Sequence, residues 1–234
     1  MTVSDAGGEA VLDPVAVSEA LAHIDEISSD ADRSEKTVTI KAQEDTGQGV
    51  RVTMGSDTMK VIADSGAVLE IEGDVGRISA PAEVTENLSN RNSSVSLEIS
   101  VADIGQMGDA QREAVGDRQT YQLLATSDGD EIHDLGGRLT VTLPYAPAED
   151  EDIQKITVFY VDDEGALYAQ PTSYEGGFVT FETTHFSYYM VQPGVSLGTG
   201  DGDDGNMLWV GAIVAILTVV ALACLAFRRR SVKG

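Results

Sequence analysis

Cysteine, histidine and basic residues are scarce in this chain of 234 residues. The single cysteine, Cys224, excludes an intramolecular disulfide, so an apolar core or bound ions must hold the fold together. With three histidines and no phosphate loop, Cys/His zinc spacing or nucleophile elbow, the sequence offers little for catalysis. We therefore expect a non-catalytic protein without a cofactor. A hydrolase built on an Asp/Glu pair stays open, because 39 carboxylates make chance pairs unavoidable.

Positive charge is also in short supply. Lys and Arg total 15 against 39 Asp and Glu, which gives a formal net charge of −24. Such a charge repels phosphate backbones, so we expect no nucleic-acid partner. The acidity is compatible with a well-solvated surface, with a salty habitat or with bound divalent cations.

One long apolar stretch is present, at residues 207–227. It holds 21 residues without a charge or a proline. At about 1.5 Å per residue a helix of this length reaches roughly 32 Å, about the thickness of a bilayer's hydrocarbon core. Trp209 near its start suits a membrane interface. The stretch predicts one transmembrane helix, with the lipid bilayer as its partner.

Basic residues predict the orientation of this helix. Arg228, Arg229 and Arg230 follow the apolar stretch at once, whereas no Lys or Arg lies between Lys155 and Arg228. Cytoplasmic flanks carry the excess of Lys and Arg. We therefore expect the tail at 228–234 in the cytoplasm and the preceding residues outside the cell, in a single-pass protein of the cell membrane.

Export needs a signal, and residues 1–13 have neither a basic start nor an apolar run. We expect the chain to be the C-terminal end of a longer precursor or to have lost its signal peptide. The rival interpretation is a tail-anchored protein with a cytosolic domain. That topology would send three arginines across the membrane.

The first half of the chain predicts helices alternating with strands. After a leader at 1–12, residues 13–103 suggest helix, strand, turn and strand repeated, with Ile40, Ile71 and Ile99 in matching places. Two β-hairpins are expected, one turning near Gly47 and one at Gly73. Coincidental α+β alternation is the alternative to a true repeat.

The second half is rich in strands. Residues 104–192 begin with a polar loop and continue as short strands separated by turns, which predicts an antiparallel β-sandwich. Residues 193–206 are rich in Gly and Asp and predict a flexible linker. The fold class expected is α+β, mainly β, with helix and hairpin units before a sandwich-like domain, a linker and one C-terminal transmembrane helix.

Three segments carry a family resemblance: LGGRLTVTLPYAP, ITVFYVDDEGAL and FVTFETTHFSYYMV. Together with the earlier GAVLEIEGDVGRISAPAEVTENL, they resemble the strand-rich module near the C-terminal end of secreted bacterial and archaeal surface proteins, many of which carry S-layer attachment domains. The likeness runs from about residue 56 to 191. It implies a non-catalytic extracellular stalk or spacer and supplies no ligand. The apolar C-terminal stretch departs from the wall-attached members.

The tripeptide His185-Phe186-Ser187 resembles the self-cleavage site of some autoproteolytic sandwich domains. By that resemblance the Ser187 hydroxyl would attack the Phe186 carbonyl, with His185 as the base. An ordinary terminal strand, with Phe186 packed inside, is the plainer interpretation.

Two further kinds of site are suggested by short patterns. Asn87 and Asn92 stand in Asn-x-Ser sequons and are candidates for glycosylation. Asp162, Asp163 and Glu164 cluster in a predicted hairpin turn and are weak candidates for calcium. Turn formation explains these carboxylates without an ion.

Three functions are therefore weighed. The first is a membrane-anchored stalk that presents itself or upstream domains. The second is an adhesin or sugar-binding module whose partners are cell-wall or surface glycans or other surface proteins. Aromatic side chains clustered on one sheet face would favour it; the candidates are Tyr174, Phe178, Tyr188 and Tyr189. The third is self-processing at the His-Phe-Ser tripeptide.

Overall fold

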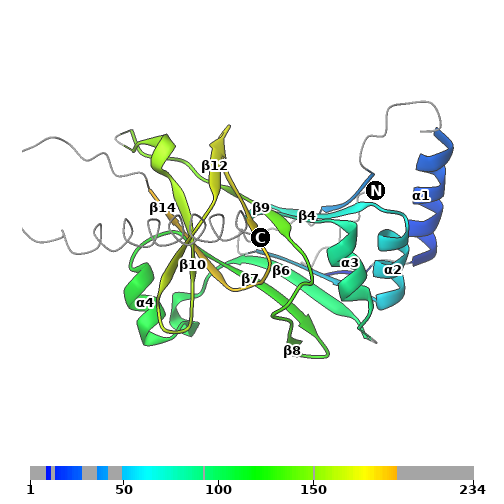
Figure 1. Cartoon of the computed structure of the whole chain (residues 1–234), viewed down its shortest axis with the longest axis horizontal. Helices are drawn as coiled ribbons and strands as arrows, with labels where there is room; N and C mark the ends of the chain where they lie inside the picture. The colour runs from blue at the N-terminus through cyan, green and yellow to red at the C-terminus, as the bar shows by residue number, and fades with distance from the viewer. Residues whose placement is uncertain are drawn as a thin grey trace, which may run out of the picture. The chain divides into compact units, whose positions relative to one another are not determined.

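The computed structural model describes residues 9–11, 14–27, 36–41, 49–91, 93–149 and 151–193 (Figure 1). They belong to one compact unit that ends at Ser196. No helix within these ranges is long and apolar enough to cross a membrane. Except for residue 193, the predicted linker, transmembrane helix and basic tail lie outside the described residues.

The protein is mainly β, with two sheets and four α-helices among its described residues. In spatial order, sheet A contains β1 (Glu9–Val11), β3 (Gly49–Met54), β6 (Val95–Val101), β7 (Thr120–Ser127), β14 (Tyr188–Gln192), β10 (Thr157–Val161) and β11 (Leu167–Gln170), with β8 (Asp130–Glu131) paired to β7. Sheet B contains β12 (Thr172–Glu175), β13 (Phe178–Thr183), β9 (Leu139–Pro144), β5 (Gly76–Ala80), β4 (Val68–Gly73) and β2 (Thr37–Lys41).

Alternating residues build the core between the sheets. In β5, β6 and β9 every second residue is buried, as expected for strands with one face on a core. Ile78, Leu97 and Val141 are among these residues, and none is more than 1% exposed. The hairpin predicted at Gly73 is confirmed: β4 and β5 are antiparallel, with Ile71 opposite Ile78.

The two predicted regions, 13–103 and 104–192, share this core. β6 of the first region pairs with β7 of the second along seven residues in sheet A. In sheet B, β5 of the first region pairs antiparallel with β9 of the second over three residues, with Ile78 opposite Val141. Each sheet therefore takes strands from both sides of the predicted boundary at residue 103. The boundary was predicted because helices alternate with strands before residue 103 and strands dominate after it. Such local patterns carry no information on which distant strands pair.

The hairpin expected around Gly47 is wrong. β2 lies in sheet B, parallel to β4, whereas β3 lies in sheet A between β1 and β6. Ile40 and Ile71 are direct neighbours in sheet B, but Ile99 belongs to sheet A. Both sheets bury the same kind of alternating pattern, so the pattern cannot say which sheet a strand joins.

Three helices lie together at one end of the sheets: α1 (Pro14–Ile27), α2 (Ser56–Asp64) and α3 (Ala82–Ser89) (Figure 1). α2 and α3 agree with the sequence, which predicts short helices from Ser56 or Asp57 to Asp64 and from Pro81 to about Leu88. α2 ends where Gly66 adopts a φ of +71°, which a residue with a Cβ disfavours, and α3 begins after Pro81. Met59 of α2 and Leu88 of α3 are buried in the main core.

A second, smaller core lies on the other side of sheet A. The 3₁₀ turn η1 (Ile104–Gln106) and α4 (Asp109–Val115) follow β6, and Met107 and Val115 pack against Phe159, Val161 and Met190. The sequence predicted a loop with one helical turn here, and α4 is longer than that turn. A second 3₁₀ turn, η2 (Ile153–Lys155), precedes β10.

Candidate functional site

The His-Phe-Ser segment connects β13 to β14 and is closely held by hydroxyl groups. The His185 carbonyl oxygen accepts from Thr183 Oγ1 at 2.9 Å and from Tyr189 Oη at 2.8 Å. Tyr189 is fully buried, and burial raises its pKa, which keeps its hydroxyl protonated. The peptide group between His185 and Phe186 is thus fixed from two sides.

The two hydroxyl contacts are not made to the peptide bond that self-cleavage would break, the one between Phe186 and Ser187. Ser187 would attack the Phe186 carbonyl, but both hydroxyls contact the preceding carbonyl, that of His185. Ser187 Oγ lies 3.5 Å from the Val161 carbonyl oxygen. The His185 ring packs edge-on against Tyr160, 4.5 Å between centroids, and burial lowers the pKa of His185, which weakens it as a base. Phe186 is 7% exposed and belongs to the core.

The acidic turn between β10 and β11 is occupied by local contacts. Asp162 accepts from the Ala166 amide at 2.7 Å and from the Tyr168 hydroxyl at 3.0 Å. Asp163 instead faces Gln111 of α4, at 3.4 Å. Of the turn residues that the sequence singled out, Asp162 stabilises the hairpin, Asp163 contacts α4, and Glu164 is exposed. Within the described ranges no group of three or more His, Cys, Asp or Glu side chains is placed to hold a metal ion.

The remaining predicted sites are split by the limits of the described chain. Asn87 lies on α3, half-buried, with its amide against the turn at Gly136. A glycan on its Nδ2 would need that turn to move. Asn92, Trp209, Arg228, Arg229 and Arg230 lie outside the described residues.

The four candidate aromatic residues do not form one exposed cluster. Tyr189 is buried, whereas Tyr174 and Tyr188 are half-buried and pack against the main and the smaller core respectively. Only Phe178 is well exposed, at 49%. It begins β13, directly opposite Pro144 of β9.

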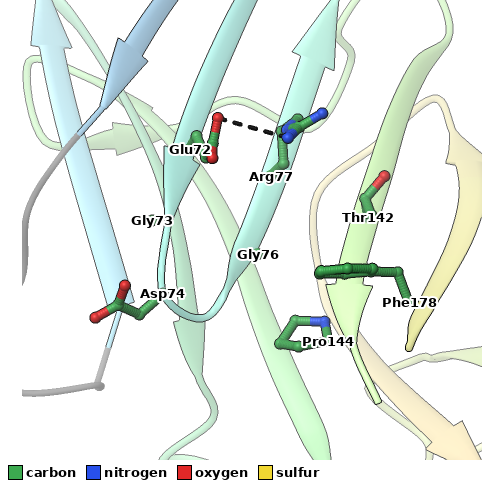
Figure 2. Close-up of a pocket in the computed structure, with 8 residues that line it drawn as sticks. All are labelled: Glu72, Gly73, Asp74, Gly76, Arg77, Thr142, Pro144 and Phe178. Atoms are coloured by element: carbon green, nitrogen blue, oxygen red, sulfur yellow. Dashed lines mark ion pairs between the residues drawn. The ribbon is translucent and has the colours of Figure 1, made fainter. Parts of the chain in front are cut away.

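Phe178 borders the cleft drawn in Figure 2, whose volume is about 220 Å³. The cleft opens on the outer side of sheet B, where the β4–β5 hairpin, β9 and β13 meet. Its lining combines a ring, two carboxylates, a guanidinium and a hydroxyl; the residues are Glu72, Gly73, Asp74, Gly76, Arg77, Thr142, Pro144 and Phe178.

Strand register brings these polar groups together. Glu72 is opposite Arg77, Arg77 is opposite Thr142, and Thr142 is opposite Thr180, so their side chains share one row across four strands. Arg77 Nη2 lies 3.5 Å from Glu72 Oε2, and Nη1 lies 3.9 Å from Glu70 Oε1. The two threonine hydroxyls are 3.2 Å apart. The sequence showed the alternation of each strand but not the order of strands, so this row was missed.

One glycine lets the backbone close the floor of the cleft. Gly76 has a φ of +150°, and a Cβ there would lie 2.7 Å from the Thr142 carbonyl oxygen. A side chain at this position would therefore push β5 away from β9. Its absence keeps Arg77 and Thr142 in register.

Comparison of the chain with protein-family models gives no match, and comparison with curated proteins gives none either.

Proposed function

We propose that this chain is a non-catalytic stalk or spacer module at the cell surface, anchored in the membrane by one helix at 207–227. The observation that carries the proposal is the order of its parts. A β-sandwich ends at β14, a spacer rich in Gly and Asp follows, and 21 apolar residues precede three arginines. In this arrangement the sandwich stands outside the cell and the basic tail is cytoplasmic.

The strand next to the spacer supports a role in holding a tether. β14 lies inside sheet A, paired antiparallel with β7 on one side and β10 on the other. Tyr189, Met190 and Val191 are each at most 1% exposed. Hydrogen bonds along both edges and packing on both faces place this strand among the last to detach in a local opening. Tension from a membrane anchor would enter the fold at this strand.

The family proposed for the module is the S-layer-associated group of secreted surface proteins that residues 56–191 resemble. On this proposal the chain presents upstream domains of a longer protein, or itself, at a distance from the membrane. The stalk needs no ligand, and the bilayer is its necessary partner.

The topology can be tested by labelling cysteines on intact cells in which the variants are expressed from the protein's own gene. In a Cys224→Ser background, Glu113→Cys places a thiol on exposed α4 and Lys233→Cys places one in the tail. A membrane-impermeant maleimide should label the first variant on intact cells and the second only after lysis. The reverse pattern, or protection of both thiols until lysis, would overturn the surface assignment.

A further inference from the structure

The cleft on sheet B is bordered on one side by an aromatic ring that is exposed to water. Phe178 is 49% exposed and stands beside Pro144, so an apolar surface borders the polar row of Glu72, Arg77 and Thr142 (Figure 2). Single exposed apolar side chains are common and need no explanation. An exposed ring beside convergent polar groups is the arrangement typical of a small-molecule site.

The polar row still has hydrogen-bonding capacity. The contacts of Arg77 with Glu70 and Glu72, 3.9 and 3.5 Å, are longer than the ~2.7–2.9 Å of a charge-assisted hydrogen bond. The guanidinium can therefore donate to a further acceptor. Glu72 Oε2 also lies 3.3 Å from Lys41 Nζ, and the carboxylate keeps lone pairs that can accept from a further donor. A hydroxyl group both donates and accepts, so it can satisfy both at once.

Together these features favour one class of ligand, and we propose that the cleft binds one neutral pyranose ring of a glycan. The C–H face of the sugar stacks on the Phe178 ring, whose face carries partial negative charge. Its hydroxyls bond to Glu72, Arg77 and Thr142. This assignment goes beyond the stalk and stands independently of it.

Size and charge narrow the ligand. A volume of about 220 Å³ is below the roughly 300–1,000 Å³ of pockets for drug-sized ligands, so one ring fits and a chain must continue into solvent. Together with Lys41, which pairs with Glu72, and Glu70, which pairs with Arg77, the lining has three carboxylates near two cations. Like charge therefore disfavours uronic and other acidic sugars at this position.

The test is calorimetric titration of the full chain in lipid nanodiscs with cellotetraose, maltotetraose and chitotetraose. At least one should give a saturable isotherm with a dissociation constant below about 1 mM. Trigalacturonate should bind at least about tenfold more weakly, because its carboxylates meet Glu72 and Asp74. Absence of saturation with all three neutral sugars would overturn the proposal, as would trigalacturonate binding as tightly as they do.

Variants then locate the binding. Phe178→Leu should weaken it by about tenfold or more, whereas Phe178→Trp keeps an aromatic face and should stay within about threefold of the wild type. Tyr168→Leu is the matched control, because Tyr168 is also 49% exposed but lies outside the cleft. Glu72→Gln should weaken binding by about threefold to tenfold while keeping the shape of the side chain. Wild-type affinity in Phe178→Leu, or equal losses in Phe178→Leu and Tyr168→Leu, would refute the site.

The outcome is separable from that of the stalk proposal. Cysteine labelling reports topology without any sugar, and the titration reports sugar binding without any cell. A flat titration would therefore leave the anchored stalk standing, and inverted labelling would leave the cleft chemistry standing.

Discussion

The outer sides of the two sheets differ in what covers them. Over β10 and β14, sheet A is covered by α4, and Phe159, Val161 and Met190 there are each at most 5% exposed. The corresponding side of sheet B carries Arg77, Thr142 and Thr180, which are half-buried and belong to neither hydrophobic core. Sheet A thus has two packed faces at β10 and β14, whereas sheet B keeps a polar outer face at β5, β9 and β13.

Under the two proposals made above, this difference would give the two sheets separate roles. Packing on both faces resists local opening, which suits the attachment point of a tether. An open polar face contributes less to stability, because its side chains remain in contact with water. It is therefore the side on which sequence can vary for recognition without loss of the fold.

The comparison is tested most strongly in the smaller core. Met190→Ala removes a fully buried side chain between sheet A and α4 and should lower the free energy of unfolding by about 2–5 kcal/mol. The matched change on the open face, Thr140→Ala in β9, should cost about 0.5 kcal/mol or less. Urea denaturation with unchanged m-values measures both. Similar losses in the two variants would mean that the faces do not differ in packing.

The next prediction concerns the packing of α4 against the turn between β10 and β11. Gly165 has a φ of +79°, and a Cβ there would lie 2.5 Å from the Ala110 carbonyl oxygen of α4. Gly165→Ala should therefore cost about 1–3 kcal/mol from backbone strain, and more from the clash with α4.

Gly129→Ala is the matched control for this change. Gly129 has a similar φ of +89° but nothing within 4 Å of its Cβ position. It should show the cost of backbone strain alone, about 1–3 kcal/mol. Thermal unfolding of both variants compares them, and equal shifts would show that α4 does not press on the turn.

The sequence predicted single elements better than their neighbours. The alternation in VSLEISV and RLTVTL predicts strands at 95–101 and 138–143, which match β6 and β9 to within a residue. Gly66 and Pro81 predict the end of α2 and the start of α3. These signals succeed because they are local. The partners of β2 and β3 were wrong because pairing depends on distant residues. β12 was missed because TSYE has few apolar residues.

The site shows the same limit more strongly. Short sequence patterns singled out His185, Asp162 and Asn87 as candidate site residues. In the structure His185 and Asp162 form local hydrogen bonds, and Asn87 packs against the turn at Gly136. Glu72, Arg77 and Thr142 belong to three different strands, and only the order β4–β5–β9 places them side by side. The exposure of Phe178 could not be predicted from the sequence, because the pattern of a strand does not show which of its terminal residues stay in contact with water.

A smaller effect on stability is expected from pH, through His185 in the connection between β13 and β14. Burial against Tyr160 lowers the pKa of His185 below the ~6.5 of an unfolded chain. At pH 8 folded and unfolded chains bind the same number of protons at this position. As the pH falls below about 6.5, the unfolded chain takes up a proton that the folded chain resists, so the free energy of unfolding decreases.

His185→Phe should remove this part of the pH dependence while keeping a ring against Tyr160. His133 is exposed, and His133→Gln serves as the control that retains the decline. Urea midpoints at pH 8, 7, 6 and 5 measure it. An unchanged slope in His185→Phe would show that this histidine contributes nothing to acid sensitivity.

The smallest effect is expected from an ion pair on the open face of sheet B. Arg138 Nη1 lies 3.1 Å from Glu182 Oε2, but the two side chains are 68% and 57% exposed. In water such a pair gains little, because solvent screens the charges and both side chains lose rotamer freedom, so the coupling should be about 0.2–1 kcal/mol. A double-mutant cycle of Arg138→Ala and Glu182→Ala, at low and high salt, measures it. Coupling well above this range that survives high salt would mean that the outer face is covered in the folded protein, and the contrast between the sheets would no longer hold.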